Sequence, residues 1–138
     1  MPIPEAWAGR LLALMRITVA LAFMQHGTSK LFGFPATLGS PDALTLPLGL
    51  LETIGGGLLV LGLFTRPVAF LLSGEMAVAY WWGHWFADPG RSLFPLVNHG
   101  EAAMIYCFVF LYLAAAGGGG WSLDALLAKR SAKMSPNE

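Results

Sequence analysis

The stretch LLALMRITVALAF, residues 11–23, decides how this chain folds, because a single arginine interrupts an otherwise apolar run. The composition around it is typical of a chain in contact with lipid. Hydrophobic residues make up 56% of the 138 and charged residues only 12%, against about 25% charged in soluble domains. The mean hydropathy is +0.62. With five tryptophans and zero net charge, the sequence favours a membrane protein and has no excess of basic charge for nucleic acid.

Four segments are long and apolar enough to cross a bilayer as helices, which takes roughly 20 residues each. They are residues 6–25, 46–64, 67–86 and 101–117. Four strands could not close a transmembrane barrel. We therefore predict an all-α membrane protein, a four-transmembrane-helix antiparallel bundle in one domain over residues 1–138. The arginine also argues against a cleaved signal peptide, because it divides the apolar core that such a peptide needs.

The connections between these segments differ in length. Residues 65–67, TRP, predict a tight turn, whereas the first loop is long, and its KLF step at 30–32 is expected to lie along the membrane interface or to dip into it. Glycines at 117–120 end the fourth helix, and Ser122 is placed to cap a further one. That segment predicts a short C-terminal interfacial helix with an apolar face. The leucines of that face are Leu123, Leu126 and Leu127.

The distribution of basic residues predicts the orientation. With four spans, both termini and the middle turn share one side of the membrane. That side holds five basic residues and the other holds two, so the positive-inside rule places both termini in the cytoplasm. The five are Arg10, Arg66, Lys129, Arg130 and Lys133, and the two are Lys30 and Arg91.

Ionisable residues inside the spans are the main candidates for function. Arg16, Glu52 and Glu75 lie within apolar segments, and Glu101 lies at the outer mouth. Each costs at least about 2.5–3.5 kcal/mol at mid-bilayer if left alone. Glycines and alanines share their helical faces, so these faces are expected to pack inside the bundle. We predict that Arg16 pairs with Glu75 or Glu52 at a similar depth. The surplus acid would carry a proton or pair with Lys30 or a histidine.

A purely structural role, in which these charges only fix the helix register, remains open. The outer helix ends also allow two interpretations. His26, His84 and His99 lie there beside Lys30 and Glu101. They belong either to an interfacial aromatic belt with solvated histidines or to a site for a quinone headgroup. The aromatic residues of this rim are Trp81, Trp82, Trp85, Phe86 and Phe94.

Metal and haem are disfavoured. His99 and Glu101 are two residues apart and so point to different faces of a helix, and no H-x-x-x-H spacing occurs. The sequence has no G-x-G-x-x-G motif, and its single cysteine, Cys107, is expected to be a packing residue. Electrons would therefore come from a partner or from the quinol itself.

Several motifs together resemble a known family. They are FMQHGTSKLFG (23–33), LETIGGGLLVLGLFTR (51–66) and NHGE (98–101). This pattern resembles the DoxX family of small four-helix membrane proteins, from about Arg10 to Asp124. At position 99 the family commonly has glycine, so His99 departs from the pattern. The resemblance implies a bacterial inner-membrane bundle linked to respiratory chemistry, like subunits of quinol oxidases and thiosulfate–quinone oxidoreductases. The matching candidate residues are Arg16, His26, Lys30, Glu52, Arg66 and Glu101.

These observations lead to a hypothesis of quinone-linked redox chemistry by an oxidoreductase subunit or accessory protein. The candidate catalytic residues are Arg16, Glu52 and Glu101, and the candidate quinone-binding residues are His26, Lys30, Glu101, Trp82 and Phe94. A small transporter or proton conduit is the alternative, and a membrane scaffold that docks a soluble redox enzyme is another. Besides the lipid bilayer, the expected partners are a quinone, a redox protein and a second copy of the chain, through the glycine-lined second helix.

Overall fold

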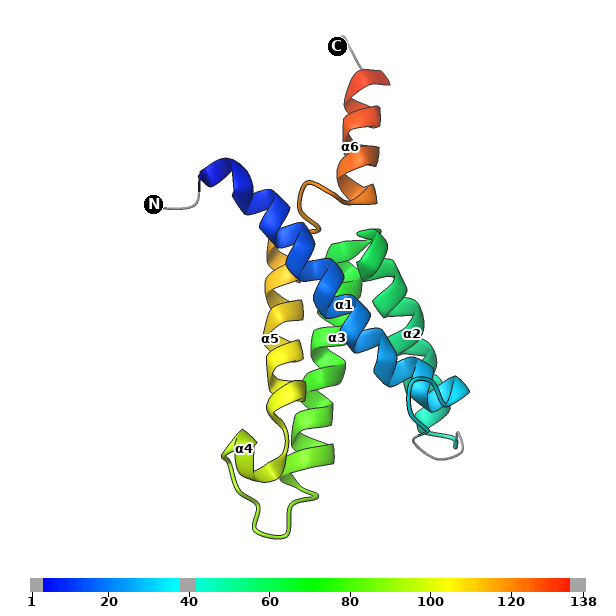
Figure 1. Cartoon of the computed structure of the whole chain (residues 1–138), viewed down its shortest axis with the longest axis vertical. Coiled ribbons are helices and arrows are strands. Elements are labelled where there is room, and N and C mark those ends of the chain that lie inside the picture. Colours follow the sequence, from blue (N-terminus) through cyan, green and yellow to red (C-terminus); the bar gives the residue numbers. More distant parts are fainter. Residues whose placement is uncertain (1–3, 38–41, 135–138) are drawn as a thin grey trace.

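The structure, a computed structural model, describes residues 4–37 and 42–134. Within these ranges the chain forms helices and no strands (Figure 1). The helices are η1 (Glu5–Trp7), α1 (Ala8–Phe32), α2 (Thr45–Leu61), α3 (Thr65–Val78), the π-helix η2 (Ala79–Trp85), α4 (Pro95–Asn98), α5 (Glu101–Ala116) and α6 (Leu123–Met134).

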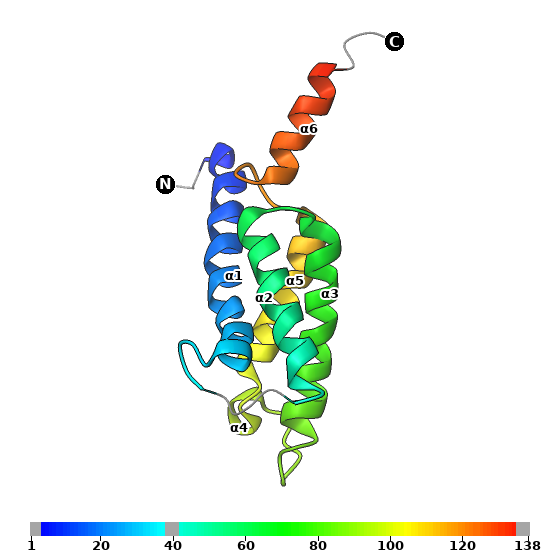
Figure 2. The same cartoon turned by 90° about the vertical axis from the view of Figure 1, so that its right-hand side faces the viewer.

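Four helices, α1, α2, α3 and α5, pack into a bundle in which α1 lies mainly on α2 and α3 lies mainly on α5. Figures 1 and 2 show α6 and the start of α1 at one end, with α4 and the loop before it at the other. In the described part of the chain, the 28-residue stretch Glu5–Phe32 is long and apolar enough to cross a membrane. Thr45–Leu61 and Glu101–Ala116 are shorter apolar helices.

Two predicted boundaries on the first half of the chain are wrong. The helix predicted over 6–25 continues to Phe32, so residues 30–32 belong to α1 and not to the loop that follows it. Nothing in the segment breaks a helix before Gly33, whose φ of 67° allows the N–H to close on Ser29. The turn predicted at 65–67 lies at 62–64, because Gly62, with φ 68°, already ends α2. Pro67 falls in the first turn of α3, as expected.

The second half also differs in detail. The helix predicted over 67–86 consists of α3 and the π-helix η2, and the polar loop after it contains the short α4. The glycines at 117–120 end α5 as predicted, and Ser122 Oγ accepts the Ala125 N–H at 3.2 Å, which confirms the cap. However, α6 does not lie across the end of the bundle. It rises away from it (Figure 2), and none of its residues is buried.

The core confirms that small residues mark the packing faces. Ala13, Arg16 and Ala20 are fully buried on α1, and Phe23 contacts Phe110 of α5 edge to face, with ring centroids 4.9 Å apart. Gly27 lets α1 and α2 approach closely. A Cβ there would stand 2.6 Å from the Thr53 nitrogen and 2.7 Å from the Gly49 carbonyl oxygen.

The glycine-lined face of α2 is largely covered from within the chain. A Cβ on Gly55 would meet Leu72 of α3, and one on Gly56 would meet Met24 of α1. Both glycines are buried. The surface suggested for a second copy is therefore already occupied at these two positions.

The close approach at Gly27 yields a test of the α1–α2 packing. Gly27→Ala would place a methyl group against backbone atoms that cannot move aside, and overpacking of this kind costs about 1–3 kcal/mol. We expect a lower thermal unfolding midpoint in detergent, followed by circular dichroism. Gly57→Ala is the control, because a Cβ there meets nothing within 4 Å. Equal midpoints for the two variants would contradict the tight contact.

Candidate functional site

Arg16 is fully buried, but its partners are main-chain carbonyls. Nη1 donates to Leu59 and, at 2.7 Å, to Val60. Nε donates to Gly118 at 2.8 Å and Nη2 donates to Trp121 at 2.6 Å. Within residues 4–37 and 42–134, no carboxylate forms an ion pair with this side chain.

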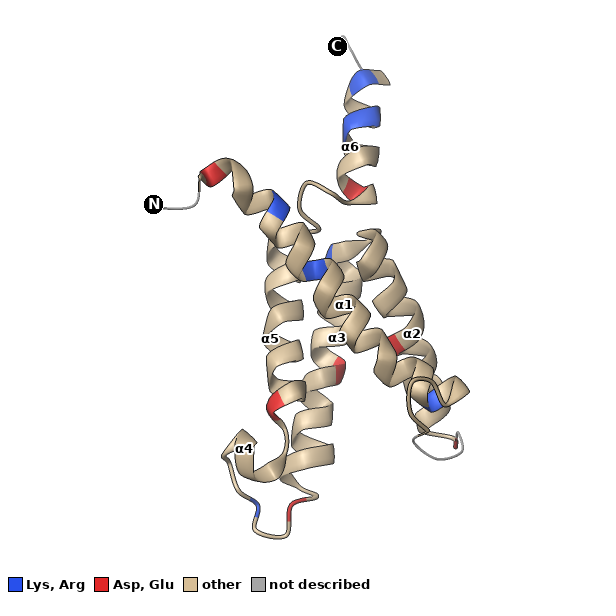
Figure 3. Cartoon of the chain, viewed as in Figure 1, with Lys and Arg blue, Asp and Glu red and all other residues tan. Residues whose placement is uncertain are grey.

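The predicted pairing of Arg16 with Glu52 or Glu75 is therefore wrong. Because α1 runs on to Phe32, Arg16 lies in the first half of the helix, next to the C-terminal turn of α2. The acidic residues of α2 and α3 lie farther toward the opposite end of the bundle (Figure 3).

Two arginines satisfy helix C-termini at this end. The last carbonyls of a helix have no N–H partner within it, and the negative end of the helix dipole favours a cation. Arg16 supplies donors to the last turn of α2. Arg66 does the same for α5, where Nη1 donates to Ala115 at 2.7 Å and to Ala114 at 3.4 Å. The geometry gives both residues a structural role, and the catalytic role expected of Arg16 remains a prediction.

Asp124 caps α3 from a distant part of the chain. Oδ1 accepts the Phe64 N–H at 2.9 Å and Oδ2 accepts the Thr65 N–H at 2.8 Å. Partial burial acts to raise the pKa of Asp124, but these backbone hydrogen bonds and the nearby charge of Arg16 outweigh it and lower the pKa below its ordinary value. Asp124 was not among the functional residues predicted from the sequence. Its position directly after a glycine-rich turn, as the single acid of that segment, was the available signal.

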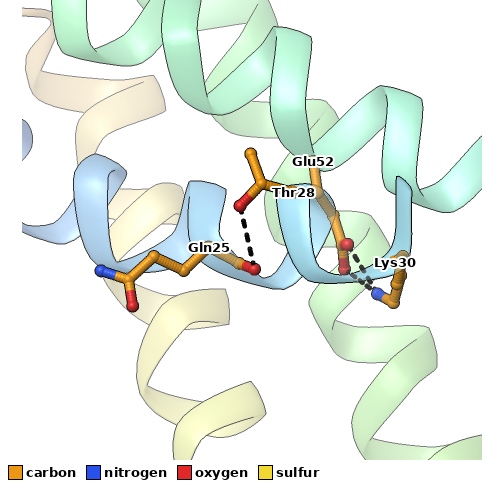
Figure 4. Close-up of polar contacts among 4 residues, drawn as sticks. All are labelled: Gln25, Thr28, Lys30 and Glu52. Atoms are coloured by element: carbon orange, nitrogen blue, oxygen red, sulfur yellow. Dashed lines mark hydrogen bonds and ion pairs between the residues drawn. The ribbon is translucent and has the colours of Figure 1, made fainter. Parts of the chain in front are cut away.

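Lys30 and Glu52 form an ion pair between α1 and α2. Lys30 Nζ donates to Oε1 at 2.5 Å and to Oε2 at 2.6 Å (Figure 4). Glu52 is 3% exposed and Lys30 is 21% exposed. The expectation that Lys30 partners one of the surplus acids is confirmed. Figure 4 also shows the Thr28 hydroxyl, which donates a hydrogen bond to the carbonyl oxygen of Gln25 within α1.

Glu75 of α3 lies within electrostatic range of both Lys30 and Glu52. Both of its carboxyl oxygens are buried, and neither has a hydrogen-bond partner among the described residues. Leaving a buried carboxylate without donors is costly, so this position favours either the neutral acid or a bound ligand. We call Lys30, Glu52 and Glu75 the polar cluster.

An aromatic group lies between α1 and α5. The Phe23 ring is 5.2 Å from Tyr106, and the His26 ring is 5.8 Å from the same tyrosine. His26 is exposed and lines a shallow groove of about 220 Å³ with Ala22, Gln25, Ser29 and Pro35. This region therefore combines apolar rings with the polar imidazole of His26.

The remaining predicted residues are not gathered with the cluster. Glu101 is the first residue of α5 and is exposed. Trp82 is 75% exposed and packs beside Phe86, and Phe94 is 73% exposed before α4. Thus Lys30 lies with Glu52, His26 lies with Tyr106, and the other three lie on the surface. Their functional roles remain predictions.

The comparisons identify relatives along most of the chain. A model of the DoxX family matches residues 11–85. An uncharacterized protein of Haemophilus influenzae is 41% identical over 91% of this chain and 97% of its own length. The inner membrane proteins YphA and YqjF of Escherichia coli are 33% and 32% identical, each over 83% of this chain, covering 88% and 90% of their own lengths. No solved structure matches.

The ion pair predicts a characteristic pattern of stability. Lys30→Met should cost about 3–5 kcal/mol, because it leaves the buried Glu52 carboxylate unpaired. The double variant Lys30→Met with Glu52→Gln should recover most of this loss. Lys133→Met, at an exposed position of α6, is the control for the substitution itself. Thermal unfolding in detergent measures the stability of all three variants. If Lys30→Met is as stable as Lys133→Met, the ion pair does not have this role.

The cap by Asp124 predicts a pH dependence. Asp124→Ala should cost about 0.5–2 kcal/mol near neutral pH. Because the folded-state pKa is lowered, this stabilisation is present above about pH 4 and is lost as the pH falls through the folded value. The difference in unfolding midpoint between wild type and variant should shrink in acid. Asp124→Asn, which keeps an acceptor without a titrating charge, should unfold with less dependence on pH. A difference that stays constant in acid would contradict the cap.

Proposed function

The chain belongs to the DoxX family, and from that premise we propose a multi-pass protein of the bacterial inner membrane that takes part in quinone-linked redox chemistry. Two relatives are named as inner membrane proteins. The four helices of the bundle would span the bilayer as one domain. Large apolar side chains point outward from each of them, as lipid contact requires. They include Leu14, Leu50, Phe70 and Phe108.

The charges support an orientation with both termini in the cytoplasm. The basic residues of α6 and of the first turn of α3 belong to the end of the bundle where α1 starts (Figure 3). Lys30 and the loop with Arg91 belong to the opposite end. Five basic residues against two follow the positive-inside rule.

The observation that carries the proposal is the buried carboxyl of Glu75, which has no hydrogen-bond partner among residues 4–37 and 42–134 and lies within electrostatic range of the Lys30–Glu52 pair. A quinone headgroup needs a donor for a carbonyl oxygen, an apolar bed for its ring and a group that exchanges protons. The Lys30 ammonium has three N–H groups, and one of them remains after its two bonds to Glu52. Glu75 would exchange the proton, and the half-buried ring of Tyr106, which packs on the buried Phe23, would supply apolar surface at the α1–α5 contact.

Other residues would serve the same chemistry from outside the cluster. His26 and Glu101 are exposed toward the same end and would pass protons to the aqueous phase. Quinol oxidation releases two electrons as well as two protons, so a redox partner would have to take the electrons. Arg16 would act by holding the helices in place, without contacting the quinone.

A proton or metabolite conduit is the second candidate, because the same orphaned carboxyl could relay protons without any redox change. The distinction is experimental. A conduit moves protons across a liposome membrane in the absence of quinone, whereas a quinone site shows binding and no such flux.

Glu75→Gln tests the proposal, because it removes the acid while keeping the shape of the side chain. We expect quinone affinity, measured by titrating the protein in nanodiscs with a short-chain quinone, to fall about tenfold, the effect of leaving a buried polar partner unmatched. Glu5→Gln, at an exposed carboxyl in η1, should leave the affinity unchanged. Equal affinity in wild type and Glu75→Gln, or proton flux without quinone, would overturn the quinone assignment.

A further inference from the structure

A second recess lies at the other end of the bundle, in the angle between α2 and α6. It is a groove of about 290 Å³ that opens to the surface. It is lined by Leu61 at the end of α2, by residues 120–122, and by Leu123, Leu126 and Lys129 of α6. The side chains that decide its chemistry are Trp121, Leu126 and Lys129.

This groove is held in shape by hydrogen bonds. Arg16 binds the carbonyls of Gly118 and Trp121, which fixes the segment that forms one wall. Asp124 accepts two N–H groups at the start of α3 and donates its own N–H to Gly62 at 2.9 Å. The first turn of α6 is therefore anchored to the end of α2, and the recess between them is preformed.

The lining combines an apolar floor with a positive rim. Leu61, Trp121 and Leu126 are all large and exposed. Lys129 is the one charged side chain among the lining residues, and Arg130 and Lys133 follow on the same helix. Asp124 is not among the lining residues, and its carboxylate faces backbone N–H groups at the start of α3.

We propose that this groove binds an anionic phospholipid. The phosphate would meet the Lys129 ammonium, and the glycerol and upper acyl chain would lie on Leu61, Trp121 and Leu126. A basic side chain at the cytoplasmic end of a span attracts anionic headgroups, and its methylene stem lies on apolar surface. An exposed tryptophan at this level is typical of the membrane interface. The inference rests on the membrane placement proposed above and is independent of quinone binding.

Native mass spectrometry of the detergent-purified protein tests it directly. Phosphatidylglycerol and phosphatidylcholine with the same acyl chains are added in separate arms, and inorganic phosphate is added in a third. We expect phosphatidylglycerol to be retained about fivefold more than phosphatidylcholine, the effect of one basic residue on an anionic lipid. Equal retention of the two lipids, or loss of the lipid adduct on adding phosphate alone, would overturn the assignment.

Substitutions test whether the lipid binds in this groove. Lys129→Gln should remove the preference for phosphatidylglycerol, and Lys133→Gln, outside the lining, should keep it. Leu126→Gln should lower retention of both lipids, because it makes the floor polar. Circular dichroism confirms that each variant is folded. A Lys129→Gln protein that is folded and still prefers phosphatidylglycerol would refute the proposal, whereas the quinone titration of the same variant should match wild type whatever the outcome.

Discussion

The rest of this fold depends on the hydrogen bonds that the Arg16 guanidinium donates to main-chain carbonyls. Arg16 extends from an apolar stretch of α1 and binds both the end of α2 and the segment that follows α5. An arginine in this setting is expensive unless every donor is engaged. Carbonyl oxygens at a helix C-terminus are suited to the task, because they have no other donors and carry the negative end of the helix dipole.

The two ends of the bundle consequently differ in character. At the α6 end, the side chains of Arg16, Arg66 and Asp124 bind main-chain groups that the helices leave open. Toward the other end, Lys30 and Glu52 form an ion pair, whereas the Glu75 carboxyl has no hydrogen-bond partner in the part of the chain that the structure describes. Proteins tend to break their own packing rules where they function. We therefore propose the carboxyl of Glu75, and not the guanidinium of Arg16, as the reactive group.

The sequence predicted the helix order and the packing faces, because apolar length and small-residue spacing are direct physical requirements of a helical bundle in lipid. It also placed Lys30 among the partners of the buried acids. It could not predict the partners of Arg16, since every residue offers a carbonyl and only the fold decides which ones are free. The end of α1 was misjudged because Gln25 and His26 are polar, as if they began a loop. Asp124 escaped notice because its cap joins residues 60 positions apart.

The long sequence separation of these contacts affects the order in which the protein is made. Arg16 leaves the ribosome about a hundred residues before Gly118 and Trp121, with which it forms two of its hydrogen bonds. During that interval the nascent first helix can engage only the carbonyls of α2. Closure of the bundle is thus a late event that awaits translation of the C-terminal segment. A chain that ends before that point would contain the four helices of the bundle, but its Arg16 would have only the α2 carbonyls as hydrogen-bond partners.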